Sequence, residues 1–202
     1  TRNGSQDIWR MDSDGGNEVQ LTKTPQFIEY ICGMSPDFKN IVYRQQSIDN
    51  SKVMLESLNL ETGQTKTIWQ DEKVYMQSAI LSPDGKNMLY ISAPIDIQSG
   101  QMPQMSLSIA SFDGINLGEP KVIQKTISGN LFRFTNDGKS LLYVENSGDN
   151  SDLFKFDIES GKITKVTNFN LETIFRYVVS VNNKKIYLVR GNISKEAVLI
   201  KN

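Results

Sequence analysis

Arginines are the side chains of this sequence best suited to bind a ligand with defined geometry. Arg133 and Arg176 each lie in a short apolar stretch, within 132–134 and 174–178. A guanidinium can donate two parallel hydrogen bonds to a carboxylate, so two converging arginines would hold the carboxylate of a ligand such as a peptide terminus. The alternative is that each arginine pairs with an acidic residue of a neighbouring element or is simply solvated.

Two compositional facts restrict hydrolytic chemistry. The chain of 202 residues contains no histidine, which removes the Ser-His and Cys-His nucleophile pairs and the usual zinc ligand sets. Its single cysteine, Cys32, lies in the apolar run 28–34 and is expected to be a buried structural thiol. Paired carboxylates could act on a glycoside without histidine, but most acidic residues lie in turns and no pair stands out. We therefore expect no catalytic residues, no metal and no cofactor.

The charge balance argues against two classes of partner. Lysine and arginine total 22 residues against 23 aspartates and glutamates, a formal net charge of −1. Such a chain has no strong long-range field to recruit nucleic acid or an anionic membrane. No stretch approaches the roughly 18 consecutive apolar residues of a membrane span. We expect neither nucleic-acid binding nor direct membrane insertion.

A repeat organises the whole sequence. Four segments align without gaps, and their first residues are separated by 47, 53 and 45 positions. Each segment has a turn of the Ser-Pro-Asp-Gly-Lys type followed by an apolar strand. The segments are 35–43, 82–90, 135–143 and 180–188.

The turn of each repeat has the chemistry of a tight hairpin. Asp84-Gly85, Asp137-Gly138 and Asn182-Asn183 tolerate the positive φ angles that short turns between antiparallel strands require. Phe38 stands where two other copies have glycine, which implies a different turn in the first repeat.

A second pair of strands falls between these hairpins. Residues 153–158 alternate apolar and polar, turn at 159–162 and resume at 163–167. Equivalent pairs lie in 7–22, 53–69 and 107–123, and no window of 11 or more residues shows a helical period. We expect an all-β fold with at least fourteen short antiparallel strands. A period near the length of four strands favours a β-propeller over a sandwich.

The motifs resemble those of the TolB-like β-propeller family, which is similar to WD-repeat propellers. The resemblance rests on the Ser-Pro-Asp-Gly-Lys turn at 82–86, the stretch Asp-Ile-Trp-Arg-Met-Asp-Ser-Asp-Gly-Gly-Asn at 7–17 and Gln-Leu-Thr at 20–22. Repeats of this type occur in periplasmic TolB proteins, in the propellers of prolyl oligopeptidases, and in bacterial receptor-type kinases and transcriptional regulators. The end of this chain resembles the closing blade of that last group. The resemblance implies architecture and leaves function open.

The repeat divides the chain into blades of one propeller region, 1–202. We expect about four blades, each a four-stranded antiparallel sheet, and the resemblance implies that they belong to a larger ring of six or seven blades with the missing ones before Thr1. If 19–22 instead closes the last blade, the result is a ring of four. The predicted blades are a partial blade 1–26, complete blades at about 27–69, 74–123 and 130–167, and a last partial blade 173–202.

In a propeller, the connections from second to third strands and from blade to blade gather on one face around the central channel, which we call the loop face. Ligands of propellers usually meet that face. The longest such connection, 92–104, carries Ile95 and Met102 and forms either a partner-binding lip or an insertion folded over the blade edge. We predict ligand-binding residues near the ends of first strands or at the start of loop-face connections: Tyr30, Arg44, Gln77, Arg133, Glu145, Arg176 and Arg190.

These observations favour a non-catalytic binding or sensing propeller that recognises a protein, a peptide or a small ligand on the loop face. One alternative is the substrate-gating propeller of a prolyl oligopeptidase-type serine peptidase, which requires a separate hydrolase domain. Another is a carbohydrate-active propeller that uses carboxylates. For a bacterial sensor or TolB relative we expect a periplasmic or other extracytoplasmic location, and a cytoplasmic one is the alternative. The absence of an internal disulfide fits either compartment.

Overall fold

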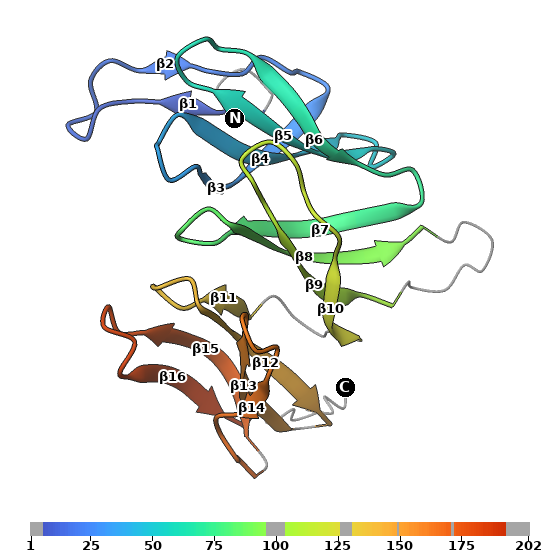
Figure 1. The fold of residues 1–202 in the computed structure, drawn as a ribbon, viewed down its shortest axis with the longest axis vertical. Helices are drawn as coiled ribbons and strands as arrows, with labels where there is room; N and C mark the ends of the chain where they lie inside the picture. The colour runs from blue at the N-terminus through green and yellow to red at the C-terminus, as the bar shows by residue number, and fades with distance from the viewer. Residues whose placement is uncertain (1–5, 96–103, 126–130, 149, 171, 193–202) are drawn as a thin grey trace, which may run out of the picture. The chain divides into compact units, whose positions relative to one another are not determined.

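A computed structural model describes residues 6–95, 104–125, 131–148, 150–170 and 172–192. The described residues form sixteen strands and no helix, and every strand pair is antiparallel (Figure 1). This confirms the all-β prediction. The chain divides into two compact units, residues 1–126 and 127–202, and each is described by itself.

The first unit begins with a short hairpin and continues into a four-stranded sheet. Strand β1 pairs with β2, as the repeat predicted for this segment. The sheet that follows has its strands in chain order, β3-β4-β5-β6. The strands are β1 (Trp9–Arg10), β2 (Val19–Gln20), β3 (Phe27–Met34), β4 (Asn40–Ser47), β5 (Val53–Asn59) and β6 (Thr65–Gln70).

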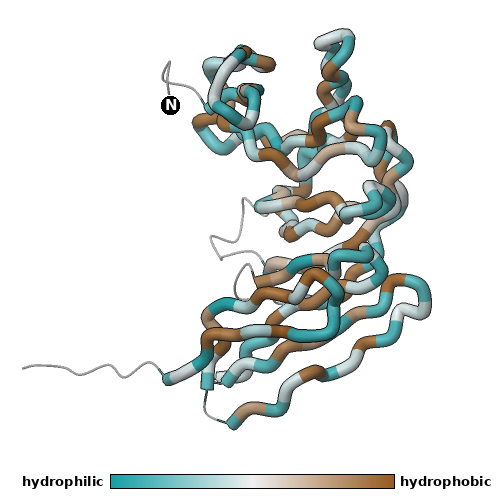
Figure 2. Tube along the Cα trace, turned by 90° about the vertical axis from the view of Figure 1, so that its left-hand side faces the viewer, coloured by the Kyte–Doolittle hydropathy of each residue, from teal (hydrophilic) through white to brown (hydrophobic). Residues whose placement is uncertain are grey.

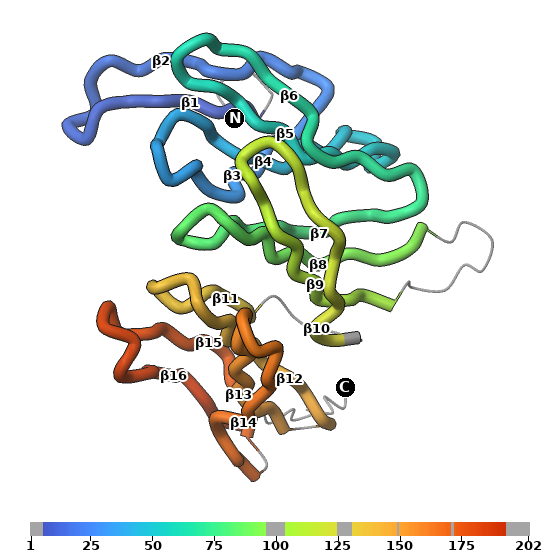
Figure 3. The backbone as a smooth tube through the Cα atoms, viewed as in Figure 1, coloured from blue at the N-terminus to red at the C-terminus, as the bar shows by residue number. Residues whose placement is uncertain are grey.

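A second four-stranded sheet completes this unit. Its strands again follow chain order, so the backbone runs back and forth through β3 to β6 and then through β7 to β10 (Figure 3). The strands are β7 (Val74–Leu81), β8 (Asn87–Pro94), β9 (Ser106–Ser111) and β10 (Lys121–Lys125).

The second unit repeats the same plan once and then begins it again. One sheet has the order β11-β12-β13-β14, and a two-stranded sheet pairs β15 with β16. The strands are β11 (Phe132–Phe134), β12 (Ser140–Ser147), β13 (Asn150–Asp157), β14 (Ile163–Lys165), β15 (Thr173–Val179) and β16 (Ile186–Gly191).

The hairpin turn between first and second strands is as predicted. Gly85 and Gly138 have φ angles of 67° and 69° between their paired strands. The hydroxyl of Ser82 donates to Asp84 Oδ1 at 2.6 Å and accepts from Asn87 N–H at 2.9 Å, which closes the turn from its side chain. A side chain at Gly85 would also collide with Pro36, because an added Cβ would lie 2.4 Å from Pro36 Cδ.

Phe38 takes this turn without glycine. Its φ of 57° lies in the left-handed region, and its side chain is 71% exposed. The prediction of a different turn at Phe38 is therefore wrong, because Ser35 and Asp37 make the same hydrogen bonds as their counterparts and hold the phenylalanine in the glycine conformation. A non-glycine residue in this region is strained by about 1–2 kcal/mol.

Apolar residues of the strands pack between successive sheets within each unit. Figure 2 shows hydrophobic and hydrophilic segments alternating along the chain. In the first unit, Val42 and Leu55 of one sheet pack against Met76 and Met88 of the next. In the second unit, Leu142 and Leu153 pack against Ile174 and Tyr177. Burial of this kind stabilises sheet pairing by roughly 25 cal/mol per Å² of apolar surface.

Two blades share a polar closure that we call the Asp–Thr clamp. In the second unit, Leu153 N–H donates to the Thr167 hydroxyl at 2.9 Å, and that hydroxyl donates to Asp152 Oδ1 at 2.9 Å. Asp152 also accepts the N–H of Phe169 at 2.9 Å and pairs with Lys165 at 2.7 Å. Although burial opposes it, the Lys165 ammonium and these donors lower the pKa of Asp152.

The first unit repeats part of this clamp at its N-terminal hairpin, where the Thr22 hydroxyl donates to Glu29 instead of Asp7. Ile8 N–H donates to the Thr22 hydroxyl at 2.8 Å, and Asp7 accepts the N–H of Thr24 at 3.1 Å and the amide of Gln20 at 2.8 Å. The matching bonds identify β1 and β2 as the third and fourth strands of a blade, equivalent to β13 and β14.

Candidate functional site

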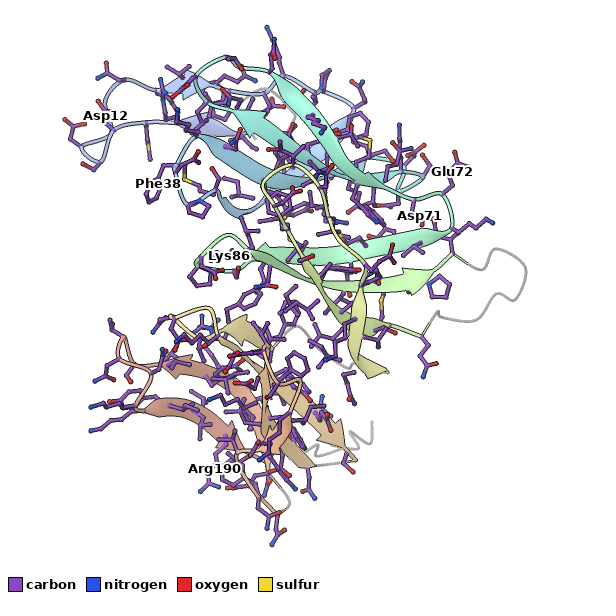
Figure 4. The ribbon with its side chains drawn as sticks, in the orientation of Figure 1. Asp12, Phe38, Asp71, Glu72, Lys86 and Arg190 are labelled. Carbon is purple, nitrogen blue, oxygen red and sulfur yellow. The ribbon has the colours of Figure 1, made fainter. Side chains whose placement is uncertain are left out.

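The first unit has two ends that differ in chemistry. Its loop face carries the connections 21–26, 48–52 and 71–73, and its opposite end carries the hairpin turns. Figure 4 shows Asp71 and Glu72 at the loop face, where β6 leads into β7, and Phe38 and Lys86 at the hairpin end. The loop-face connections carry three exposed acids, Asp49, Asp71 and Glu72, and three exposed lysines, Lys23, Lys52 and Lys73, so this rim is charged but balanced.

Arg44 lies in the loop-face half of β4 and reaches from its own sheet to the next one. The side chain is only 4% exposed, so the prediction of an arginine at the start of an open connection is wrong. The strand continues through Ser47 and buries Arg44 between two sheets. Its Nε donates to the backbone oxygen of Met76 at 2.7 Å, and its Nη2 donates to Tyr75 Oη at 3.2 Å and to Gln46 Oε1.

Two tyrosines flank this guanidinium. Tyr30 is the cross-strand neighbour of Arg44, and its ring centroid lies 5.1 Å from Arg44 Cζ. Tyr75 comes from the next sheet, with its ring centroid 5.8 Å from the same atom. Arginine over an aromatic face is attracted by about 0.5–2 kcal/mol. Tyr30 is 48% exposed, so this side of the site meets solvent.

Arg44 has no carboxylate partner among the described residues. Its three hydrogen bonds use Nε and Nη2, and Nη1 makes none within the described part of the chain. A buried charge without a counter-charge is costly where the guanidinium gives up its hydration, but Nη1 is not one of the unpartnered atoms that the described residues bury completely, so solvent reaches it. The equivalent positions in the other repeats, nine residues after the first serine or threonine of the turn, hold Ile91, Val144 and Val189. Arg44 is therefore a charged residue at an apolar position of the repeat.

Cys32 lies beside this site and is buried, and its burial was predicted from its apolar surroundings. The thiol donates to the backbone oxygen of Tyr30 at 3.7 Å. Burial raises the pKa of the Cys32 thiol from 9.0 to about 12, although Arg44 acts in the opposite direction. The thiol is therefore protonated and unreactive in the folded chain.

Glu29 forms a second buried polar site on the opposite face of the same sheet. Its Oε1 accepts from the Thr24 hydroxyl at 2.7 Å and from Gln45 Nε2 at 3.1 Å. Its Oε2 accepts from the backbone N–H of Ile8 at 3.1 Å and from the hydroxyl of Thr22. Four donors saturate the carboxylate, so Glu29 is a structural acceptor that joins the N-terminal hairpin to the first four-stranded sheet.

Glu56 on β5 is a further carboxylate. It lies on the same face of the sheet as Glu29. Its Oε1 accepts from the Thr67 hydroxyl at 2.7 Å. Burial raises the pKa of Glu56, with a smaller contribution from the charge of Glu29. We expected no pair of carboxylates to stand out in the sequence, and Glu29 and Glu56 do not, because they lie on different strands.

The predicted pair of arginines belongs to the second unit. Arg133 on β11 and Arg176 on β15 are both exposed. The Cζ atom of Arg133 lies 5.8 Å from the ring centroid of Tyr177, and within the described residues Arg133 and Arg176 share no bonding partner. Arg133 comes two residues before Thr135, and Arg176 comes four residues before Ser180, so they occupy different positions of the repeat.

Two other predicted residues lie inside strands. Arg190 is within β16, where it pairs with Glu172 at 2.7 Å and lies over the ring of Phe169 at 4.1 Å. Glu145 is within β12, and burial raises the pKa of its carboxyl. Both were predicted at the start of connections. The second strands of these blades extend farther than their apolar residues indicate, because their ends pair with polar neighbours.

The remaining predictions have mixed outcomes. Gln77 is exposed at an irregularity in β7, next to Met76, which accepts the Arg44 hydrogen bond. Most of the connection 92–104 lies outside the described residues.

Within the described part of the chain, no three histidine, cysteine, aspartate or glutamate side chains are grouped to hold a metal ion. The described residues also include no helix that could cross a membrane.

The structure thus joins two of the predicted residues, Tyr30 and Arg44, in one site and adds Tyr75 and Gln46 to it. Sequence reasoning missed these two, and it missed Glu29. A position-by-position comparison of the repeats would have identified Glu29, which stands six residues before Ser35 where other copies have Met76 and Ile174.

Solved structures with a similar fold include TolB proteins and peptidases. TolB from Acinetobacter baumannii matches with a TM-score of 0.63 and 21% identity, over 90% of this chain and 42% of that one. A putative TolB from Agrobacterium tumefaciens matches with a TM-score of 0.57 and 19% identity, over 80% of this chain and 56% of that one. A puromycin-hydrolyzing peptidase from Mycobacterium tuberculosis matches with a TM-score of 0.66 and 11% identity, over 92% of this chain and 32% of that one.

These likenesses show the fold, which is that of a β-propeller built from four-stranded blades. This chain spans less than two thirds of the length of each of these structures. Comparison of the sequence with protein-family models and with curated proteins found no match.

Proposed function

We propose that this chain is a non-catalytic recognition propeller that binds a protein or peptide partner on its loop face. The observation that carries the proposal is the site around Arg44, where a buried guanidinium and two tyrosines lie in the loop-face half of their strands. Tyrosine and arginine dominate the binding energy of many protein interfaces. On the other face of the sheet, four donors already occupy the carboxylate of Glu29.

The absence of histidine supports a binding role over a hydrolytic one. Neither a serine nor the buried Cys32 thiol has an imidazole base to activate it. A bacterial propeller of this kind would act in the periplasm or at another extracytoplasmic site, which belongs to the same proposal.

A peptidase propeller is the second candidate. Puromycin hydrolase gives a TM-score of 0.70 at 15% identity over 92% of this chain and 32% of that one. In that case the chain would gate access to a hydrolase domain elsewhere in the full-length protein. The full-length gene separates the two candidates, because a hydrolase domain favours the peptidase and a kinase or DNA-binding domain favours the sensor.

The proposed face is tested by panning a display library of random nine-residue peptides against the chain and measuring the selected peptides on variants. We expect Tyr30→Ala, on the first strand beside Arg44, to weaken binding about tenfold or more, because aromatic and charge-assisted contacts are worth about 1.5–3 kcal/mol.

The matched controls are Lys86→Ala and Lys162→Ala, which remove exposed cations in hairpin turns. These should change affinity less than twofold, because hydrated surface charges contribute little. Equal losses from Tyr30→Ala and from the controls would place binding on another surface. Turnover of a selected peptide that a single serine substitution abolishes would refute the non-catalytic role.

A further inference from the structure

The guanidinium of Arg44 is incompletely bonded, and we propose that it binds the carboxylate of a peptide ligand between the first two four-stranded sheets of the chain. This inference rests on the proposed recognition function and names the chemical group recognised. The ligand class is a peptide that presents a C-terminal carboxylate or an acidic side chain.

The bonding of Arg44 indicates where the carboxylate binds. Nε is directed to Met76 and Nη2 to Tyr75 and Gln46, while Nη1 has no partner among the described residues. A carboxylate that accepts from Nη1 and Nη2 would complete the end of the guanidinium fork, with one Nη2 bond exchanged for it. Gln46 is the side chain best placed to give up its bond to Arg44, because its amide nitrogen also donates to Asn50 on the loop face and can keep that bond.

The surroundings make a carboxylate the favoured occupant. Arg44 is a fixed cation with no anion among the described residues, and the Tyr30 and Tyr75 rings flank it, which leaves the residue only 4% exposed. Charge-assisted hydrogen bonds strengthen where water is excluded. A neutral ligand would leave the charge as costly as before, whereas a carboxylate neutralises it.

Charged residues at the rim of the loop face also select among peptide ligands. Asp71 and Glu72 are exposed at the start of the connection that enters β7, three to four residues before Tyr75 (Figure 4). The exposed Lys73 follows them, so the two acids attract a cationic group of the ligand locally and give the face no net charge. The ligand expected from this pattern has a carboxylate next to a positively charged residue, as at a peptide C-terminus that follows a lysine.

A purely structural role for Arg44 makes a different prediction. If the arginine only braced two sheets, replacement by isoleucine, the residue at the equivalent position 91, would destabilise the chain. If the arginine is retained for a ligand, Arg44→Ile removes an uncompensated buried charge, and the free protein should melt at the same temperature or higher. The ligand-induced rise in melting temperature should then be lost.

The direct experiment uses the peptide acetyl-Gly-Lys-Gly as the free acid and as the C-terminal amide. We expect the acid to bind at least tenfold more tightly by calorimetry and to shift the ¹⁵N–¹H signal of Arg44 Nε. Arg44→Lys keeps the charge without the planar fork and should reduce acid binding at least tenfold. The control Arg10→Lys removes an exposed guanidinium and should change nothing.

Two results overturn the inference. One is equal binding of the acid and the amide to the wild-type chain, which needs no variant to fold. The other is undiminished acid binding by Arg44→Lys. Failure of this test together with face-specific binding of library peptides removes only the carboxylate site. Acid binding at Arg44 without any preference of library peptides for one face removes only the proposed function.

Discussion

Glu29 and Arg44 occupy opposite faces of one sheet, and both replace apolar residues of the repeat with a buried charge. The carboxylate of Glu29 accepts four hydrogen bonds, which use its full hydrogen-bonding capacity. Arg44 makes three and keeps one nitrogen without a partner among the described residues. The same sheet therefore contains one saturated buried charge and one unsaturated buried charge.

The difference follows from the supply of partners inside a β-sheet. A carboxylate needs donors, and hydroxyls, amides and a free strand-end N–H provide them around Glu29. A guanidinium needs five acceptors, yet most backbone oxygens between paired strands are already used in ladders. The fold itself can therefore supply all the hydrogen-bond donors that an acid buried between blades needs. A buried arginine keeps donors that a ligand can use.

The largest effect should appear in the reactivity of Cys32, which reports on how well the space beside Arg44 is sealed. Because its pKa rises from 9.0 to about 12, the thiolate population at pH 8 is about a thousandfold lower than in the unfolded chain. Alkylation by iodoacetamide, followed by mass spectrometry, should be slower by that factor or more. Alkylation at the rate of a free thiol would show that this space is open to bulk solvent.

The next effect tests whether Glu29 is a completed structural acceptor. Glu29→Leu restores the apolar character of the repeat but leaves the donors of Thr22, Thr24 and Gln45 without their acceptor. We expect the free energy of unfolding to fall by about 3 kcal/mol in urea denaturation, the penalty of a broken buried network. Glu72→Leu, at an exposed acid, is the control. A loss below about 1 kcal/mol would remove the distinction between the two faces.

A third buried polar contact lies in the second unit and involves no charge. It serves as the uncharged comparison for Glu29 and Arg44. The Tyr177 hydroxyl donates to the backbone oxygen of Leu142 at 2.6 Å between two sheets. Tyr177→Phe should lower the unfolding free energy by about 1–1.5 kcal/mol, the range for a neutral buried hydrogen bond. Tyr187→Phe, at an exposed ring, should change nothing measurable. A Tyr177 effect as large as that of Glu29 would mean that charge adds nothing to these contacts.

The smallest effect is a pH dependence from Glu56. Because burial raises its pKa in the folded state, the protonated form is favoured there, and the stability it confers is lost as pH rises through the folded pKa. Glu56→Gln should therefore gain stability relative to wild type between about pH 4 and pH 7, by less than about 1 kcal/mol after solvent screening. Unfolding curves measured at both pH values test this, and a gain confined to acidic pH would reverse the sign.

The sequence predicted the strands because each repeat carries its own turn chemistry. Asp84-Gly85 and Asp137-Gly138 mark hairpins through local backbone preference, which needs no knowledge of neighbouring blades. The turn at Phe38 was mispredicted because side-chain bonds from Ser35 and Asp37 outweigh the intrinsic preference of phenylalanine.

The site was only partly predictable, since it depends on contacts between strands far apart in sequence. Arg44 and Tyr30 were chosen for their chemistry, but the burial of Arg44 depends on Tyr75 and Met76 in the next sheet. Glu29 was overlooked because alternation along a single strand cannot show which face meets another blade. Aligning the repeats with one another shows which face of a strand meets another blade.

The Asp–Thr clamp also determines where the chain can be cut for blade shuffling. Asp7 and Asp152 bind backbone N–H groups two residues beyond the clamp threonines, at Thr24 and Phe169. A graft joined immediately after Thr22 or Thr167 would separate each aspartate from its last donor. A junction placed after Phe169 and before the next strand would transfer the closure of the second unit intact, whereas the closure of the first unit also needs Glu29 on β3.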